Sequence, residues 1–240
     1  MQNCHNILIL HGWRLSGDKY LNLVKLLSSE KKIHVFFPDM PGFGKKETPL
    51  KPYSLDDYVD FIDKFLKANK ISKTIIIGHS FGGRVAIKYA SLLPQKVEKL
   101  ILTGVPGFLP VSNLKVKFFL LLSKLGGLIF RLPILSSTQD LAQKILYRIS
   151  GANDYARVEG IMRKTFKLII REDLVKSMEN LRVPVALVWG ERDTIVPVSI
   201  AYRMNKVISG SKLTIIKNTT HKLPYENYRE FYQAIKIFLI

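Results

Sequence analysis

The sequence predicts an α/β fold with a mostly parallel, doubly wound sheet, into which a helical cap is inserted. Three observations support this prediction. Short β-branched runs alternate with longer amphipathic stretches in residues 1–106, the alternation stops in residues 107–181, and it returns in residues 182–240. We therefore divide the chain into a core made of its two outer parts and a cap made of residues 107–181.

Six short apolar runs supply the expected strands. They span residues 7–10, 33–37, 74–77, 99–103, 185–189 and 212–216. The stretches between them have helical periodicity, and the expected helices span residues 20–28, 55–68, 84–92, 199–207 and 225–239. Such alternation indicates βαβ units, whose parallel strands leave their carboxyl ends at one edge of the sheet.

The middle of the chain shows only helical periods, which glycines and prolines interrupt. Its most apolar segment, residues 114–130, contains three lysines and a Gly-Gly break. It is also shorter than the roughly 20 apolar residues that a membrane span requires. We therefore expect a pair of lid helices here rather than a transmembrane helix.

The 240 residues are 47% hydrophobic and 23% charged, which is the composition of a globular domain with a sizeable core. The net charge of +18 favours weak association with anionic surfaces. The basic residues are scattered and form no block of five or more, so we expect no specific nucleic-acid partner.

The single cysteine, Cys4, cannot form an intramolecular disulfide. The N-terminus shows no basic region followed by a long apolar run, so no secretory signal is expected. We therefore expect a cytoplasmic protein. The sequence leaves the oligomeric state open.

The motif G-H-S-F-G at residues 78–82 lies between an expected strand and an expected helix. A strand that turns sharply into a helix needs small neighbours, and it holds Ser80 out at the edge of the sheet. The N–H groups of the helix N-terminus then favour negative charge near that hydroxyl. The alternative is a glycine-rich turn that binds phosphate, although the Lys-Ser/Thr ending of a P-loop is missing.

Further motifs extend this pattern along the chain. They are L-H-G-W at residues 10–13, P-D-M-P-G-F-G at 38–44, W-G-E-R-D at 189–193 and T-H at 220–221. With the serine turn, they make the chain resemble the α/β-hydrolase family over residues 5–106 and 182–240. Within the family, it looks most like small esterases and carbon-carbon hydrolases with a helical lid. The resemblance implies hydrolysis without a metal or an organic cofactor, and a serine at position 80 disfavours dehalogenases and epoxide hydrolases.

The chain order serine, acid, histidine of this fold predicts a catalytic triad of Ser80, Asp193 and His221. The other four histidines are excluded by their positions in the sequence. Glu191 is the local rival for the acid. Asp39 lies in a Pro/Gly turn, where a carboxylate more often organises backbone amides than performs chemistry.

The backbone N–H groups of Trp13 and Phe81 are the expected oxyanion donors. Trp13, Phe118, Phe119 and Phe130 are the expected substrate-binding residues, although each aromatic ring of the cap could simply pack the cap onto the core. We expect short to medium esters or thioesters of apolar acyl groups as substrates.

The sequence leaves three alternatives open. The first is a carbon-carbon bond hydrolase of ring-cleavage dienoates, which requires additional cationic and polar groups in the pocket, for which Arg84 and the arginines of the cap are the candidates. The second is a lid-gated ligand receptor that retains the triad without using it. The third is a protein that binds a membrane surface through a basic cap.

Overall fold

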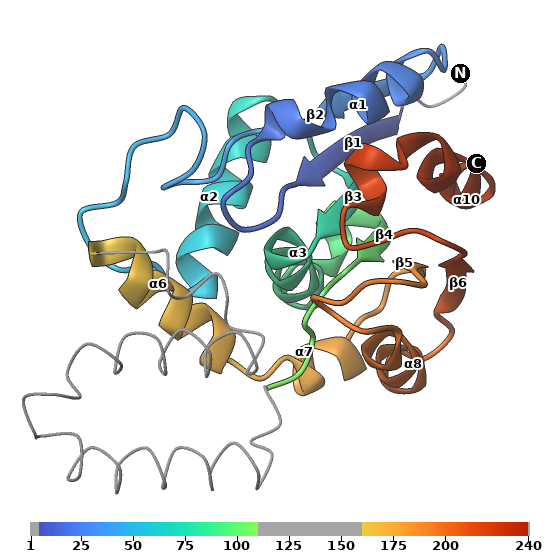
Figure 1. The fold of residues 1–240 in the computed structure, drawn as a ribbon. Coiled ribbons are helices and arrows are strands. Elements are labelled where there is room, and N and C mark those ends of the chain that lie inside the picture. Colours follow the sequence, from blue (N-terminus) through green and yellow to red (C-terminus); the bar gives the residue numbers. More distant parts are fainter. Residues whose placement is uncertain (1–4, 110–159, 240) are drawn as a thin grey trace, which may run out of the picture.

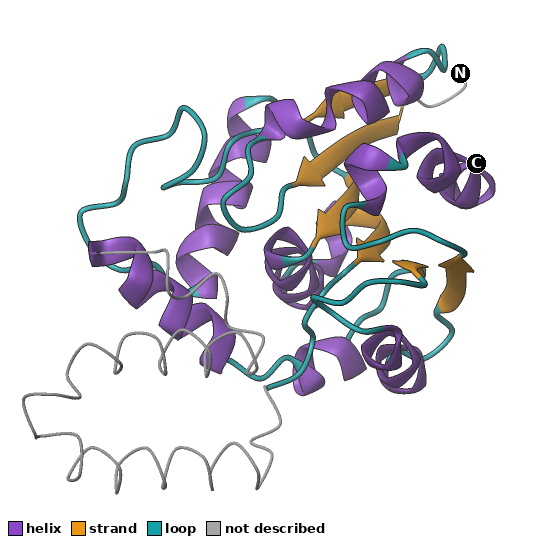
Figure 2. Cartoon of the chain, viewed as in Figure 1, coloured by secondary structure: helices purple, strands orange, loops and turns teal. Residues whose placement is uncertain are grey.

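The computed structural model of the chain describes residues 5–109 and 160–239, and in these ranges six strands form one sheet (Figures 1 and 2). The strands are β1 (His5–Leu10), β2 (Ile33–Phe36), β3 (Thr74–His79), β4 (Val97–Thr103), β5 (Val185–Gly190) and β6 (Lys212–Ile216). Their order across the sheet is β2-β1-β3-β4-β5-β6, and every neighbouring pair is parallel. The predicted α/β fold is confirmed.

The helices follow the strands as predicted, with shifted ends. They are η1 (Gly17–Tyr20), α1 (Leu21–Ser28), α2 (Leu55–Ala68), α3 (Phe81–Leu92), η2 (Pro94–Lys96), α6 (Gly160–Arg171), α7 (Val175–Glu179), α8 (Val198–Val207), α9 (Leu223–Glu226) and α10 (Tyr228–Leu239). α3 begins directly after Ser80 rather than at residue 84, because the chain passes from strand to helix without a linker. The single helix predicted for residues 225–239 is divided at Asn227 between α9 and α10.

Helices cover both faces of the sheet, as the doubly wound pattern predicts (Figure 1). Side chains alternate along a strand, so neighbouring residues of β1 enter different cores. Leu8 and Leu10 pack in the core with α2, α3 and α8, whereas Ile7 and Ile9 pack in the core with α1 and α10. All four side chains are at most 1% exposed, which explains why this strand is a continuous apolar run in the sequence.

α2 has the residues 55–68 that the sequence predicts, because its start is well specified. The hydroxyl of Ser54 accepts the N–H of Asp57 at 3.2 Å, and the carboxylate of Asp57 accepts the N–H of Ser54 at 2.7 Å. This capping box satisfies two N–H groups that the helix itself leaves free. The buried positions recur at helical spacing: Leu55, Tyr58, Val59, Ile62 and Leu66.

The strand order changes direction at β1. The chain runs from β1 to β2 on one side and then to β3 on the other, so the loops that follow β1 and β3 diverge at the carboxyl edge of the sheet. Doubly wound sheets bind ligands in the crevice that such a divergence leaves. The loop after β1 contains Trp13 and the turn after β3 contains Ser80, so the topology brings these two candidate site residues to one place.

The range predicted as the cap is described only in part. Phe118, Phe119 and Phe130 lie outside the described residues, so their role in a substrate pocket stays a prediction. Within 107–181, the structure describes the short stretch up to residue 109 and the helices α6 and α7. The division of the chain into core and cap also stays a prediction. Among the described helices, none is long and apolar enough to cross a membrane.

Arg84 of α3 ties both ends of this range to the core. Its guanidinium donates to the carbonyl oxygens of Pro106, Ile169 and Glu172, which lie before and after the part that is not described. Arg84 is 2% exposed, and burial lowers its pKa to about 10. The side chain therefore fastens the two stems of the predicted cap against the helix that follows Ser80.

Candidate active site

Ser80 occupies a strained turn between β3 and α3. Its φ is 52° and its ψ is −115°, a conformation that costs a non-glycine residue roughly 1–3 kcal/mol. Gly82 lets the turn close, because a Cβ there would lie 2.2 Å from the carbonyl oxygen of Leu10 at the end of β1. The N–H of Ser80 donates to Thr103 O at 2.9 Å, and the N–H of Gly82 donates to His11 O at 3.1 Å. These contacts hold Ser80 between the carboxyl ends of β1 and β4.

Asp193 and His221 are in direct contact, although they follow different strands. Nδ1 of His221 lies 2.8 Å from Oδ2 of Asp193. Oδ1 of Asp193 accepts the N–H groups of Ile195 at 2.9 Å and Val196 at 2.7 Å, and the residue is 5% exposed. Because a carboxylate only accepts hydrogen bonds, it holds the His221 proton on Nδ1 and leaves Nε2 free to accept another proton.

The rival acid Glu191, and Asp39 of the Pro/Gly turn, bind backbone N–H groups instead of His221. Glu191 is exposed, and its Oε2 accepts the N–H of Asn218 at 3.0 Å. Asp39 accepts the N–H of Gly17 at 2.7 Å and that of Lys45 at 2.8 Å. It therefore organises backbone amides, as its Pro/Gly context predicts.

The His221 ring packs closely against Gly104, where a side chain would not fit. Its φ is 58°, and a Cβ at this position would lie 2.7 Å from Cε1 of His221 and 3.3 Å from Oδ2 of Asp193. Gly104 directly follows Thr103, whose carbonyl binds the N–H of Ser80, so the three predicted residues gather around the end of β4. Among the described residues, no hydrogen bond joins the Ser80 hydroxyl to His221. Catalytic hydrogen bonds of this kind often tighten only when substrate binds.

The backbone N–H groups of Trp13 and Phe81 lie at the ends of neighbouring strands. That of Phe81 belongs to the first turn of α3, where N–H groups have no acceptor within the helix. Within the described ranges, neither N–H group donates to a protein acceptor. The preceding N–H, that of Gly12, donates to the hydroxyl of Tyr20 at 3.2 Å. The lack of an acceptor for the N–H groups of Trp13 and Phe81 in 5–109 and 160–239 agrees with the oxyanion role expected of them.

The indole ring of Trp13 lies in an aromatic cluster beside the serine turn. Its centroid is 4.8 Å from that of Phe43, 5.3 Å from Phe81 and 5.0 Å from Phe166. Phe166 comes from α6, so a helix of the predicted cap range contributes to this apolar wall. The indole N–H of Trp13 is buried and has no hydrogen-bond partner among the described residues. Sequence reasoning missed Phe43 and Phe166, because an aromatic residue in a turn or a helix gives no sign of its distant partner.

Two further histidines beside the site are buried and neutral. Burial lowers the pKa of His79 well below its ordinary value of 6.5, and the neighbouring His221 lowers it further. Burial also lowers the pKa of His11. Nε2 of His11 accepts the N–H of Met40 at 2.9 Å, so its proton lies on Nδ1, which is 2.9 Å from the carbonyl oxygen of Gly12. Both ring nitrogens of His11 and of His79 therefore have hydrogen-bond partners within the protein.

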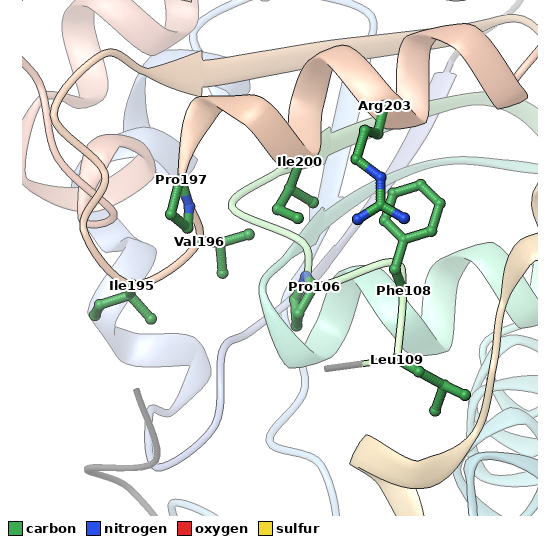
Figure 3. A pocket seen from close by; sticks show the side chains of 8 residues that line it. All are labelled: Pro106, Phe108, Leu109, Ile195, Val196, Pro197, Ile200 and Arg203. Atoms are coloured by element: carbon green, nitrogen blue, oxygen red, sulfur yellow. The ribbon is translucent and has the colours of Figure 1, made fainter. Parts of the chain in front are cut away.

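A groove adjoins the loop that contains Asp193 (Figure 3). One side is formed by residues 106–109, which follow β4, and the other by α8 and the loop before it. Its volume is about 200 Å³, and its lining is apolar apart from Arg203. The guanidinium of Arg203 lies 4.0 Å from the centroid of the Phe108 ring, which it covers. The groove supplies a second apolar surface close to the predicted acid.

A parallel doubly wound sheet with a strained serine turn and a hydrogen-bonded acid–histidine pair at its carboxyl edge defines a class of proteins. The sequence profile described as the alpha/beta hydrolase fold matches residues 6–228. The chain therefore belongs to the α/β-hydrolase fold family.

Individual relatives agree with this assignment. The human monoacylglycerol lipase ABHD6 is 29% identical over 260 residues, which cover 98% of this chain and 75% of that protein. A thermophilic esterase from Thermogutta terrifontis has a TM-score of 0.73 at 21% identity, covering 99% of this chain and 90% of the other. A meta-cleavage product hydrolase from Pseudomonas fluorescens has a TM-score of 0.70 at 22% identity, covering 99% and 91%. These two solved structures share one fold, but one is named as an esterase and the other as a meta-cleavage product hydrolase. The fold alone therefore does not determine the substrate.

Proposed function

We propose that this chain is a serine hydrolase that cleaves carboxylic ester or thioester bonds of small apolar acyl substrates. The contact between Asp193 and His221 is the main support, because it joins a buried carboxylate to a mostly buried imidazole, whose side chains are 1% and 11% exposed, beside the strained turn of Ser80. A carboxylate and an imidazole that served only as solvated loop residues would gain nothing from burial. The similarity to a protein named as a lipase supports the same reaction class.

The proposed reaction has two halves. The hydroxyl oxygen of Ser80 attacks the acyl carbon while its proton passes to Nε2 of His221, and Asp193 stabilises the resulting imidazolium. The N–H groups of Trp13 and Phe81 stabilise the oxyanion. His221 then gives its proton to the leaving alcohol or thiol, and an acyl-enzyme remains. In the second half, water attacks the acyl carbon, its proton passes to His221, and Ser80 leaves as the hydroxyl while the acid is released.

The described surroundings favour an apolar acyl group. The aromatic cluster around Trp13 lies beside the serine turn, and the groove beside the Asp193 loop is lined mostly by apolar side chains. Burial of apolar surface of this kind contributes roughly 25 cal/mol per Å². A medium acyl chain is therefore a better fit than a polar or strongly charged one.

The carbon-carbon hydrolase alternative requires cationic groups in the pocket. Arg84 was the candidate nearest to Ser80 in the sequence, but its guanidinium is committed to three carbonyl oxygens and is 2% exposed. A residue held in this way is unavailable to an anionic dienoate. Ester or thioester hydrolysis therefore remains our proposal.

Initial rates on p-nitrophenyl esters from acetate to decanoate, on matched acyl thioesters and on a dienoate panel test this proposal. We expect turnover of esters or thioesters with apolar acyl groups, and Ser80→Ala should lower kcat by about 10⁴ to 10⁶. Activity confined to large polar substrates or to dienoates would contradict it. A folded protein without turnover on any substrate would support the ligand-receptor alternative instead.

The surplus of basic residues supports a separate proposal about binding to anionic surfaces. A net charge of +18 attracts anionic surfaces without specificity, so we propose a weak, salt-sensitive association with anionic vesicles. Co-sedimentation with phosphatidylserine vesicles at low and high salt tests it, and binding that salt leaves unchanged would contradict it. A cytoplasmic location stays a prediction.

A further inference from the structure

We propose that Tyr20 and His79 are positioning residues. Together they form a chain of hydrogen bonds, which we call the strut, that fixes the loop containing Gly12 and Trp13 relative to the loop containing His221. The inference deepens the proposed function and rests on it. Tyr20 ends η1, His79 precedes Ser80, and His221 follows β6. The strut thus joins parts of the chain that are far apart in sequence.

Three hydrogen bonds form the strut. The hydroxyl oxygen of Tyr20 lies 3.2 Å from the amide nitrogen of Gly12 and 2.6 Å from Nδ1 of His79. Nε2 of His79 lies 3.0 Å from the carbonyl oxygen of His221. The bonds therefore run without interruption from the residue before Trp13 to the backbone of the proposed base.

The direction of every bond is fixed by its ends. A carbonyl oxygen only accepts, so Nε2 of His79 holds the proton and donates it to His221. The ring is buried and neutral, which leaves Nδ1 bare and ready to accept the Tyr20 proton. The Tyr20 oxygen is then free to accept the N–H of Gly12, since an amide only donates. The Tyr20 hydroxyl therefore donates once and accepts once, each ring nitrogen of His79 has a single role, and the loss of either side chain leaves a partner unpaired.

The side chains of the strut are buried and closely packed. Tyr20 and His79 are each 1% exposed, and a Cβ on Gly12 would lie 3.1 Å from Nδ1 of His79. The ring of Tyr225 packs against both, with centroids 5.8 Å from Tyr20 and 5.9 Å from His79. A change at one end of the strut must therefore shift the loop at the other end.

The arrangement also explains which N–H serves the oxyanion. Because Tyr20 accepts the N–H of Gly12, the next N–H along the loop, that of Trp13, is the one without an acceptor in the described part of the chain. At the other end, the bond from His79 fixes the backbone of His221, whose ring contacts Asp193. Reacting groups that move by about 1 Å can lose on the order of 100-fold in rate. Tyr20 and His79 thus act on the oxyanion donor and on the base together.

The test compares two tyrosine-to-phenylalanine variants of the full chain. Tyr20→Phe removes only the hydroxyl of the strut. Tyr225→Phe removes a hydroxyl from the same ring cluster that has no hydrogen bond to the described residues, so it is the matched control. We expect Tyr20→Phe to lower kcat for a p-nitrophenyl ester by about 10- to 100-fold while KM stays within about threefold. Tyr225→Phe should stay within about twofold of wild type in both constants.

A purely structural role would give a different result. Tyr20→Phe would then lower the melting temperature but leave kcat unchanged when measured well below it, and that outcome overturns the proposal. If Tyr20→Phe does not fold, the histidine variants decide. His79→Gln keeps one donor and one acceptor, whereas His79→Leu keeps neither, so the glutamine variant should retain more kcat. Equal losses in the two variants overturn the strut.

A readout without turnover separates this inference from the proposed function. If wild type hydrolyses no ester, the proposed function fails, but the coupling between the loops can still be measured by NMR. Tyr20→Phe should then shift the amide resonances of both Trp13 and His221, and Tyr225→Phe should shift them less. A shift confined to one of the two loops overturns the proposal.

Discussion

Replacing Asp193 with asparagine removes the charge behind His221 and leaves the shape of the side chain unchanged. Oδ1 is held by the N–H groups of Ile195 and Val196 at 2.9 and 2.7 Å, so the amide oxygen of the variant should remain there. Its NH₂ group then faces Nδ1 of His221, at the position where Oδ2 now lies 2.8 Å away. An NH₂ group only donates, so Nδ1 must become the acceptor.

The imidazole proton must therefore move to Nε2, and the ring can no longer accept the proton of Ser80. Holding the ring in this wrong tautomer costs about 10⁴ in kcat. That factor corresponds to about 5 kcal/mol of transition-state stabilisation. Because the two backbone hydrogen bonds of Oδ1 are kept, we expect a change of less than about 1 kcal/mol in the free energy of unfolding.

The assay is the steady-state hydrolysis of p-nitrophenyl butyrate, with the melting temperature recorded for each variant. Glu191→Gln is the matched control, since it makes the same change of charge two residues earlier, on an exposed side chain that binds Asn218. It should keep kcat within about twofold of wild type. A folded Asp193→Asn variant that retains more than a tenth of kcat, or an equal loss in Glu191→Gln, would refute this reasoning.

Three further predictions concern the serine turn and its neighbours. Phe81→Ala should keep kcat within about tenfold of wild type, because the main-chain N–H of Phe81 is the acting group. Ser80→Ala should lose about 10⁴ to 10⁶ in kcat, and equal losses in the two folded variants would exclude a main-chain role for Phe81. Gly82→Ala should lower the free energy of unfolding by about 1–3 kcal/mol or more in urea titrations, since its Cβ would meet the oxygen of Leu10 at 2.2 Å. A variant as stable as wild type contradicts that close approach. The free energy of unfolding should also fall as the pH drops from 7 to 5, by up to about 1.4 kcal/mol per pH unit for His79 alone. The unfolded chain binds a proton below 6.5 that the buried ring refuses, so His79→Gln should flatten this slope, and an unchanged slope would contradict it.

Most of the fold could be predicted from the sequence, because local rules and packing agree along the core. The strand at residues 7–10 is buried on both faces, so it appears as an unbroken apolar run. The helix at 55–68 has both a capping box and an apolar stripe. Some element boundaries lie elsewhere than helical periodicity predicts. α3 starts at Phe81 because the elbow around Ser80 holds the chain in a conformation that few residues adopt, which helical periodicity does not reveal.

The candidate site could be predicted only as far as motifs and chain order reach. Ser80 directly follows β3, and Asp193 and His221 lie in the loops after β5 and β6, so parallel strands bring all three to one edge of the sheet. The link between Tyr20 and His79 left no trace in the sequence, because a single hydrogen bond between distant side chains has no period or spacing. Side-chain contacts of this kind become visible only in three dimensions.

Labelling with a fluorophosphonate, followed by peptide mass spectrometry, tests the central claim most directly. The reagent forms a bond to a serine oxygen only where a base activates the hydroxyl. Our account predicts one adduct per chain, located on Ser80, which is lost in Ser80→Ala and is formed much more slowly in Asp193→Asn. A folded wild-type protein that takes up no label, or takes it up at another residue, would contradict the proposed catalytic role of Ser80.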